Sequence, residues 1–537
     1  MERPWTSLRA ALGCALFCAG AAGLAAAEAA EPPPPGSELA VGSAAALDLA
    51  ALRRVARQLE PAGAGAPSAA RALTLEQAIE IALSQNLQLQ IAALDVASAE
   101  PAVTASEAFF DPSAGLRLES QGTKLDPEDG DPEPRQAADF RNDYRAAAFV
   151  RQQAPTGGSV TLSAGYFRED RNDPCDPGVA GDPGDCPLDP QSGAVLGLND
   201  PSTSEGAGFL IELRQPLLRG GRTFVARRQI RDAELGLEIE RARLAAQILE
   251  VRARAQAAYF DAVLAERLIE VIAAALARDR ELVRASQALF DAGQVHRRDL
   301  YSAELRLASD RAELARRRTA RALAQHRLRE VLGLPPDQAV APGEREIPFR
   351  AVPLRLPEWL ASARQHRPEL LELRQRLAQS ALELRVRGNA LLPQLDLVGR
   401  YGRSQDLANR DWLAGLLLEI PLGNRAARSL LTQAELRHAR LLREELALER
   451  RIEFEVRDAG SRLAGGAERI QALASELESA RGKREVAQAR FEMGAANNLD
   501  VTDADQDLIR AESELLAAVV DCASQLAVLE ARVAAPL

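Results

Sequence analysis

The sequence predicts a mainly α-helical protein with a small β part, arranged as two similar halves. Residues 288–314 recur without a gap 201 positions later, as residues 489–515. Both halves show the same order of patterns: a helix, short alternating segments, a long helix, a polar turn and a shorter helix. Such self-similarity indicates an internal duplication, so we expect one elongated unit. The identical pairs of the repeat are Ala288/Ala489, Phe290/Phe491, Gly293/Gly494, Asp299/Asp500, Ala303/Ala504, Leu307/Leu508, Glu313/Glu514 and Leu314/Leu515.

The composition and the N-terminal pattern favour an exported protein. The chain has 537 residues, a net charge of −11 and interspersed charges of both signs, which does not favour nucleic acid as a partner. Residues 1–27 have the pattern of a secretory signal peptide, with a lipid-modified start at Cys14 as the alternative. Residues 28–72 are rich in Ala, Gly and Pro and predict a linker or arm. No later run of about 20 uncharged apolar residues follows, so a crossing of the membrane requires strands.

The first repeat is expected at residues 73–335. It opens with a helix of roughly 35 residues that is capped by Thr74 and broken or kinked near Pro101. Residues 114–215 then contain four short, partly alternating segments, which predict strands. Two long connections flank a tight turn at 154–158, a pattern that an outer-membrane barrel and a soluble meander both show. Because the hairpin formed by the two middle segments has this short turn, we expect it to join the sheet.

Cysteine positions predict one disulfide. Cys175 and Cys186 lie close together in the second long connection, and an oxidising compartment favours their pairing. Cys522 stands alone on a predicted helix, where a packed thiol is expected.

A long helix is predicted over residues 222–291. Ile230, Leu237, Leu244 and Val251 recur at intervals of seven, which is typical of coiled-coil packing against neighbouring helices. At 1.5 Å per residue such a helix is roughly 100 Å long. A turn, or tip, separates it from a second helix. The remaining expected segments are the helix 299–332, a Pro-rich connector at 336–356, and a second repeat at 357–537 with a helix interrupted near Pro368, strands within 394–420, a long helix 425–493, a second tip and a helix 500–534.

Five motifs stand in a specific order and spacing. They are LTLEQAIEIALSQN at 73–86, the strand-to-helix corners QPLLRGG at 215–221 with Pro216 and IPLGN at 420–424 with Pro421, RPELLELRQRLAQSALELRVRGNALLPQLDLVGRYG at 367–402, and ARFEMGAANNLDVTDADQDLIRAE at 489–512. Together they resemble the TolC-like family of outer-membrane efflux proteins, over nearly all of the chain after the predicted signal peptide. The resemblance implies homotrimers that build a shared transmembrane β-barrel in the outer membrane, joined to a long periplasmic α-helical coiled-coil barrel. It also implies a periplasmic adaptor and an inner-membrane transporter as partners.

The same resemblance implies a gate at the helix tips. Asp500 and Asp503 match family aspartates that form rings of carboxylates in the trimer, and Asp299 is the counterpart of Asp500 in the first half. Rings of carboxylates favour cations. We expect Arg297 and Arg298 to pair with Asp500 or Asp503 when the duct is closed. The alternative is that Asp299 and Asp500 are only N-caps. Gly293 and Gly494 are expected to end the long helices, and Phe290 and Phe491 to pack at the tips.

No pattern in the sequence indicates an enzyme, a cofactor or a metal. The four histidines lack the spacing of a metal site, and no nucleophile motif or phosphate loop is present. Two functions are weighed: a trimeric exit duct for efflux or type I secretion, and a periplasmic structural or adaptor coiled coil that never inserts. Residues 208–213 and 413–418 are apolar enough to face lipid, which an adaptor does not require.

Overall fold

The computed structural model divides the chain into two compact units, where the sequence predicted one. The sheet unit comprises Ala102–Ala233 and Ser380–Arg437. The helical unit comprises the described residues up to Pro101, Glu234–Gln379 and His438–Leu537. The residues described are 71–125, 139–174, 199–293, 296–347, 352–404, 409–493 and 495–535. The predicted signal peptide, nearly all of the arm at 28–72, and the proposed disulfide partners Cys175 and Cys186 lie outside them.

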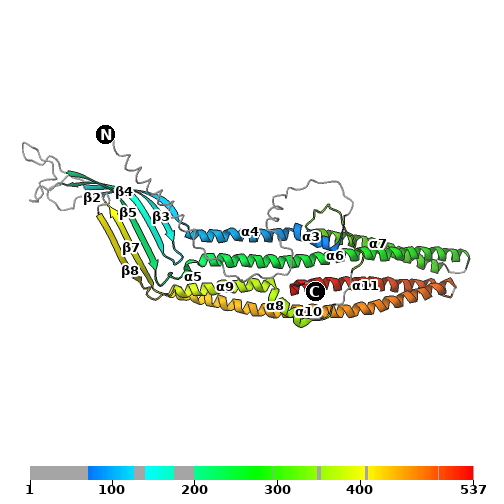
Figure 1. Ribbon diagram of the computed structural model, residues 1–537. Helices are drawn as coiled ribbons and strands as arrows, with labels where there is room; N and C mark the ends of the chain where they lie inside the picture. The colour runs from blue at the N-terminus through cyan, green and yellow to red at the C-terminus, as the bar shows by residue number, and fades with distance from the viewer. Residues whose placement is uncertain are drawn as a thin grey trace, which may run out of the picture. The chain divides into compact units, whose positions relative to one another are not determined.

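The sheet unit is built on one antiparallel sheet of six strands (Figure 1). Hairpin β3–β4 lies inside this sheet, as expected from its short turn, where Gly157 takes a φ of 85°. Short segments η1 (Ala108–Phe110) and α5 (Thr223–Ala226) adjoin the sheet in sequence. The strands, in the spatial order β2-β3-β4-β5-β7-β8, are β2 (Ser113–Leu125), β3 (Asp139–Gln153), β4 (Ser159–Pro174), β5 (Asn199–Pro216), β7 (Gln394–Ser404) and β8 (Asn409–Glu419).

The helical unit is dominated by two pairs of consecutive helices (Figure 1). The first pair is α6 (Arg228–Asp291) with α7 (Arg297–Leu332), and the second is α10 (Arg425–Glu492) with α11 (Asn498–Val533). The division between the two units falls within α6 and α10, and also within α4 and α9. The other elements are β1 (Arg71–Leu73), α3 (Leu75–Gln85), α4 (Leu87–Glu107), β6 (Val340–Pro342), α8 (Leu356–His366) and α9 (Pro368–Asn389).

The first helix breaks at Asn86 and not at Pro101, which lies within α4. The Asn86 side chain accepts hydrogen bonds from the backbone N–H groups of Gln88 and Leu89, so it caps the start of α4. Its amide also donates to the carbonyl of Val331, which ties the break to the end of α7. The break therefore comes from a capping asparagine.

Three further boundaries differ from the sequence prediction. The long helix of the first half is interrupted at Arg227, between α5 and α6. The shorter helices begin at Arg297 and Asn498, each two residues before the expected aspartate. Arg71–Leu73, assigned to the arm in part, pairs in parallel with Val340–Pro342 of the connector.

The core of the first half gathers around Tyr259 of α6. Val251 and Ala258, positions expected from the heptad pattern or its continuation, are buried in the same cluster. The Tyr259 hydroxyl donates to the carbonyl of Leu73 at 2.9 Å and accepts from the N–H of Glu344 at 3.3 Å. A buried side chain thus satisfies two backbone groups beside the β1–β6 pair.

We expect Tyr259→Phe to lower the free energy of unfolding of the helical unit by about 2 kcal/mol, because the substitution leaves the N–H of Glu344 without its partner and removes one of the two donors to the carbonyl of Leu73. Urea unfolding followed by circular dichroism measures the change. Tyr301→Phe is the matched control, since the Tyr301 ring is exposed. Equal effects of both substitutions would contradict the role given to the Tyr259 hydroxyl.

Candidate functional site

One face of the six-stranded sheet is apolar across all of its strands. Alternate residues of a strand point to the same face, and the strand register aligns these residues from β2 to β8. Most of the large side chains on this face are exposed in the single chain. This apolar face comprises Leu116 and Leu118; Ala146, Ala148 and Val150; Val160, Leu162, Ala164 and Tyr166; Phe209, Ile211 and Leu213; Leu395, Leu397 and Tyr401; and Trp412, Ala414, Leu416 and Leu418.

A row of aromatic side chains borders the apolar face. Tyr401 lies directly opposite Trp412, and its ring centroid is 6.1 Å from that of Phe209. Tyr166 continues the row on β4, and its hydroxyl donates to the carboxylate of Glu205. Aromatic side chains with one apolar and one polar end are suited to the boundary between lipid and water. Beyond the row the same face carries charge, at Arg168, Arg403 and Arg410.

The opposite face carries charged pairs that bridge adjacent strands. Arg141 of β3 contacts Glu169 of β4 at 2.9 Å. Arg400 of β7 contacts Glu212 of β5 at 2.8 Å. Neutralised pairs on one face and apolar side chains on the other give the sheet two different surfaces. A sheet of this kind fits a boundary between lipid and water-filled space.

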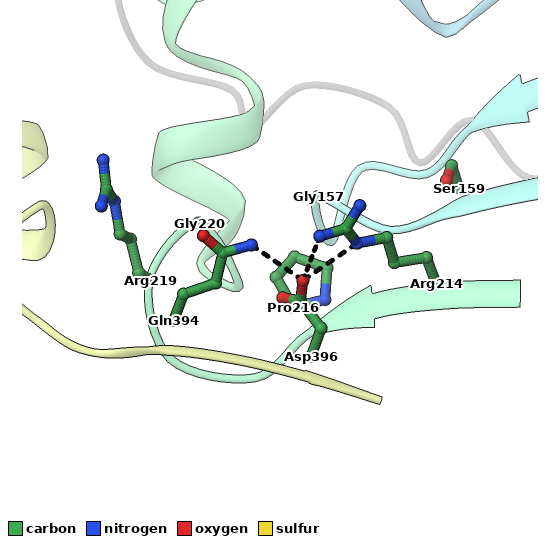
Figure 2. A pocket seen from close by; sticks show the side chains of 8 residues that line it. All are labelled: Gly157, Ser159, Arg214, Pro216, Arg219, Gly220, Gln394 and Asp396. Atoms are coloured by element: carbon green, nitrogen blue, oxygen red, sulfur yellow. Dashed lines mark hydrogen bonds and ion pairs between the residues drawn. The ribbon is translucent and has the colours of Figure 1, made fainter. Parts of the chain in front are cut away.

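The corner after β5 encloses a pocket of about 290 Å³. Figure 2 shows the Arg214 guanidinium and the Gln394 amide both directed at the buried carboxylate of Asp396. The Nη2 atom of Arg214 lies 2.5 Å from Oδ2 of Asp396, and Nε2 of Gln394 donates to the same oxygen at 2.9 Å. The lining residues are Gly157, Ser159, Arg214, Pro216, Arg219, Gly220, Gln394 and Asp396.

The pocket is part of the joint between the strands and the helices. A side chain at Gly157 would place its Cβ 2.3 Å from the carbonyl oxygen of Gly220, so the β3–β4 turn packs directly on the corner. The buried Asn389 side chain accepts from the N–H of Gly220 at 2.8 Å. At the second corner, which follows Pro421, Nδ2 of Asn424 donates to the carbonyl of Leu391 at 3.3 Å. Side chains from distant parts of the sequence therefore fix the corners, whereas no group in the pocket is arranged for nucleophilic chemistry.

Two of the predicted gate aspartates, Asp299 and Asp500, lie in the first turn of the helices that follow the tips. The Asp500 carboxylate accepts from the N–H of Asn497, whose own side chain accepts from the N–H of Asp500. Asp299 accepts in the same way from the N–H of His296. Both aspartates are therefore the third helical residues of capping motifs, and the N-caps are Asn497 and His296. The alternative that Asp299 and Asp500 are themselves the N-caps is therefore wrong. Both carboxylates nevertheless stabilise the first turn of their helix, because each accepts a hydrogen bond from the N–H of the N-cap residue.

Asp503 is engaged by a lysine that the sequence reasoning missed. Nζ of Lys483, on α10, lies 2.7 Å from Asp503 and 2.6 Å from Asp507. The two carboxylates hold the pKa of Lys483 above its usual value through hydrogen bonds. The sequence did mark this position as unusual, because Lys483 is one of only two lysines among the 66 lysines and arginines of the chain. Its contact with Asp503 required the packing of α10 on α11.

The two predicted basic residues make no ion pair within the described part of the chain. The Arg297 guanidinium lies over the ring of Tyr301, 5.5 Å from its centroid. Arg298 is exposed. A pairing of either arginine with the aspartates is thus not formed inside one chain, and it stays a prediction for contacts between chains.

The remaining tip residues occupy packing and turn positions. Phe491 packs against the small cluster of Leu282, Ala303 and Val501. Phe290 is half-buried. Gly293 has a φ of 70° in the turn after α6, and Gly494 lies outside the described residues.

A buried asparagine joins the two tips. Asn498 opens α11, and its Nδ2 donates to Oγ of Ser286 on α6 at 2.6 Å and to the carbonyl of Asp299 on α7 at 3.0 Å. Ser286 in turn donates to the carbonyl of Leu282. One side chain therefore connects three helices, although from sequence alone it is only a polar residue near a helix start.

Among the described residues, no group of three or more His, Cys, Asp or Glu is placed to hold a metal ion. No helix in the same residues is both long and apolar enough to cross a bilayer. Cys522 is buried in the core of the second half, and this burial raises the pKa of its thiol, as expected for a packed cysteine.

Comparison with known proteins identifies relatives along most of the chain. The family model for outer membrane efflux proteins matches residues 136–334 and 359–533. Nodulation protein T of Rhizobium leguminosarum bv. trifolii is 27% identical over 291 residues, and the match covers 50% of this chain. The alkaline protease secretion protein AprF of Pseudomonas aeruginosa is 26% identical over 291 residues and 52% of the chain. The chain spans 60% of the length of each of these curated relatives.

A solved structure shares the fold over nearly the full length. The outer-membrane channel OprN superposes with a TM-score of 0.62 at 18% sequence identity. The superposition covers 94% of this chain and 98% of that channel.

We expect Asn498→Ala to loosen the tips, because Ser286 and the carbonyl of Asp299 lose a buried donor. Amide hydrogen exchange in residues 286–303 should become at least several-fold faster. Gln506→Ala, an exposed change on the same helix, is the control. Unchanged exchange in Asn498→Ala would rule out the asparagine as the joint between the tips.

Proposed function

Since the chain belongs to the outer membrane efflux protein family, we propose that it is the outer-membrane channel subunit of a tripartite efflux or type I secretion system. Three copies form the exit duct, with the strands in the outer membrane and the helices extending into the periplasm. The partners are a periplasmic adaptor and an inner-membrane transporter. The chain transports and does not catalyse.

The apolar face of the sheet is the observation that carries this proposal. It continues through all six strands, ends at an aromatic row, and exposes large side chains such as Leu118 (79%) and Trp412 (77%). Exposing a large apolar surface to water is unfavourable, whereas contact between that surface and lipid is favourable. The polar pairs on the opposite face then line the water-filled side.

The open edges of the sheet support assembly into a trimer. Within the described residues, strands β2 and β8 each pair with one other strand, so the outer edge of each carries a row of backbone N–H and C=O groups that no described strand pairs. Within lipid no water is present to form hydrogen bonds with these groups. A sheet that spans the membrane must therefore close on itself, so that every strand has two neighbours. Pairing β2 of one copy with β8 of the next closes a barrel of eighteen strands from three chains of six. Natural barrels of about this size leave an aqueous channel.

The helices give independent support for neighbours. Leu305 on α7, and Phe454 and Val486 on α10, are exposed in the single chain. Helix faces that carry such side chains are typical of packing between subunits. In the proposed duct they are covered by the adjacent copies.

The gate is proposed at Asp500 and Asp503. In a trimer each of them contributes three carboxylates to the inner mouth, where they attract cations. Lys483 lowers the effective charge of Asp503, so Asp500 is expected to dominate selectivity. Arg297 and Arg298 remain candidates for locking contacts with the aspartates of a neighbouring copy.

The alternative is a periplasmic structural or adaptor coiled coil that never inserts. The long helices suit both functions. The apolar face distinguishes them, because an adaptor has no use for an exposed apolar sheet with an aromatic border.

We expect Leu162→Arg to block insertion, because a charged side chain facing the middle of the bilayer costs about 2–4 kcal/mol in a transmembrane barrel. Membrane fractionation, followed by electrophoresis for detergent-resistant trimers, measures the loss. Thr161→Arg places the same side chain on the opposite face of β4 and should insert normally. If wild type is a fully soluble monomer, or if Leu162→Arg inserts as well as Thr161→Arg, the duct is refuted.

Removing both gate carboxylates, in Asp500→Ala with Asp503→Ala, should raise conductance and weaken cation selectivity in planar bilayers. The reason is the loss of two carboxylate rings from the constriction. Asp521→Ala removes an exposed carboxylate elsewhere on α11 and should change neither property. Unchanged selectivity in the double variant would refute the ring assignment.

A further inference from the structure

Six charged side chains meet inside the helical unit, away from the predicted gate aspartates. They come from all four long helices and comprise three carboxylates and three guanidinium groups. Asp279, Asp310 and Asp505 are only 3%, 5% and 6% exposed. We name this group the charge cluster: Arg278 and Asp279 of α6, Arg306 and Asp310 of α7, Arg484 of α10, and Asp505 of α11.

Two of the three carboxylates have a guanidinium partner. Nε of Arg278 lies 2.9 Å from Oδ1 of Asp505, and Nε of Arg484 lies 3.6 Å from the same oxygen. Nη2 of Arg306 lies 3.2 Å from Oδ2 of Asp310, within α7. Asp505 therefore links α11 to both α6 and α10, whereas the Arg306–Asp310 pair joins no second helix.

Asp279 is the carboxylate without a cation. No arginine or lysine of the described chain lies within 4.0 Å of it, and its Oδ2 atom is buried without a hydrogen-bond partner. Its interaction across the helix interface is with the carboxyl group of Asp310. Two buried carboxyl groups can hydrogen-bond to each other only if one of them carries a proton.

The surroundings of Asp279 favour its protonated form. Burial contributes most, followed by the charge of Asp310 and the hydrogen bond to it, and together they raise the pKa of Asp279 to about 7. Arg306 acts in the opposite direction, and Asp505 adds a smaller repulsion. Arg278 and Arg484 are the remaining charged groups of the cluster, and both are directed at Asp505.

We propose that Asp279 and Asp310 hold one proton between them, and that this shared proton latches α6 to α7 near the first tip. When the proton leaves, two carboxylates face each other across a buried interface, and the Arg306 guanidinium offsets only part of their repulsion. Their repulsion favours separation of the helices, which admits water to both groups.

The direction of the pH dependence follows from the raised pKa. An aspartate exposed by separation of the helices has the ordinary pKa of 3.8, whereas the latched aspartate titrates near 7. The latched form therefore binds more protons between these values, and its stability falls as pH rises through that window. Above pH 7 the ionisation of Asp279 causes no further loss of stability of the latched form. Acid closes the latch and neutral to alkaline pH releases it.

The latch is well placed to act on the tip. Asp279 lies 12 residues before the end of α6 at Asp291, about 18 Å along the helix. Between them lie the small apolar cluster of Leu282, Ala303 and Val501 and the hydrogen bond from Asn498 to Ser286. In the proposed duct, release of the latch opens the inner mouth, and this consequence rests on the proposed function.

Infrared difference spectroscopy of the full-length protein in detergent tests the shared proton. Between pH 6 and pH 8, wild type should lose the carbonyl band of a protonated carboxyl group, with a midpoint near pH 7. Asp279→Asn should lack this band, because the amide donates to Asp310 without a titrating proton. Asp521→Asn, an exposed carboxylate on α11, is the control and should retain it. Absence of the band in wild type, or its persistence in Asp279→Asn, would overturn the proposal.

Planar-bilayer conductance of the same preparations tests the effect on the tip. Wild type should show a several-fold increase in open probability between pH 6 and pH 8, and Asp279→Asn should stay at the pH 6 level throughout. Matching circular dichroism and trimer content show that the variant is folded. A wild-type conductance without pH dependence would overturn the link to the tip. A protein that forms no pore refutes the proposed duct instead, and the infrared band then decides the shared proton alone.

Discussion

The unpaired edges of the six-stranded sheet are the constraint on which the rest of the molecule depends. A strand edge exposes backbone donors and acceptors that need partners, and an apolar face needs surroundings without water. An open sheet in lipid cannot meet both requirements. Lipid covers the apolar face, but it offers no hydrogen-bond partners to the backbone groups at the strand edges. In the duct proposed above, closure with further copies of the same chain resolves the conflict. Within the sheet unit, the hydrogen bonds of Asn389, Asn424 and Gln215 hold the strand-to-helix corners in place.

The repeated segment gives two tips with the same local geometry and different side chains. Both following helices open with a capping motif whose third residue is an aspartate. Lys483 stands where the other copy has Leu282, and Asp503 stands where it has Ser302. The ion pair therefore exists in one tip, whereas the other contributes Leu282 to the apolar cluster. Asn498 of the second tip donates hydrogen bonds to Ser286 and to the carbonyl of Asp299 in the first. The contact between the tips therefore depends on side chains in which the two copies differ.

Local sequence patterns were enough to predict the elements that depend on neighbouring residues. Alternation predicted the strands, heptads predicted the long helices, and the short turn with Gly157 placed β3 and β4 in the sheet. The break at Asn86 was missed because the proline rule outweighed a capping side chain whose other partner, Val331, is 245 residues away. The charge cluster was missed for the same reason, since Arg278 and Asp505 are 227 residues apart. Partners of this kind are fixed by packing, and a single sequence carries no signal for them.

Burying three carboxylates among partly buried arginines in a helical bundle is an unlikely way to gain stability. An ion pair removed from water loses most of its Coulomb energy to desolvation, and an apolar replacement of similar volume is often as stable or more so. The helical unit has apolar clusters around Tyr259 and around Trp359, so it can build such a core. Near the tips it has instead a small apolar cluster and a set of charged groups. Apolar packing changes little with the solution, whereas charges respond to protons and to other charges. The contacts near the tips are therefore more sensitive to pH than those of the two large apolar clusters, as the proposed gate requires.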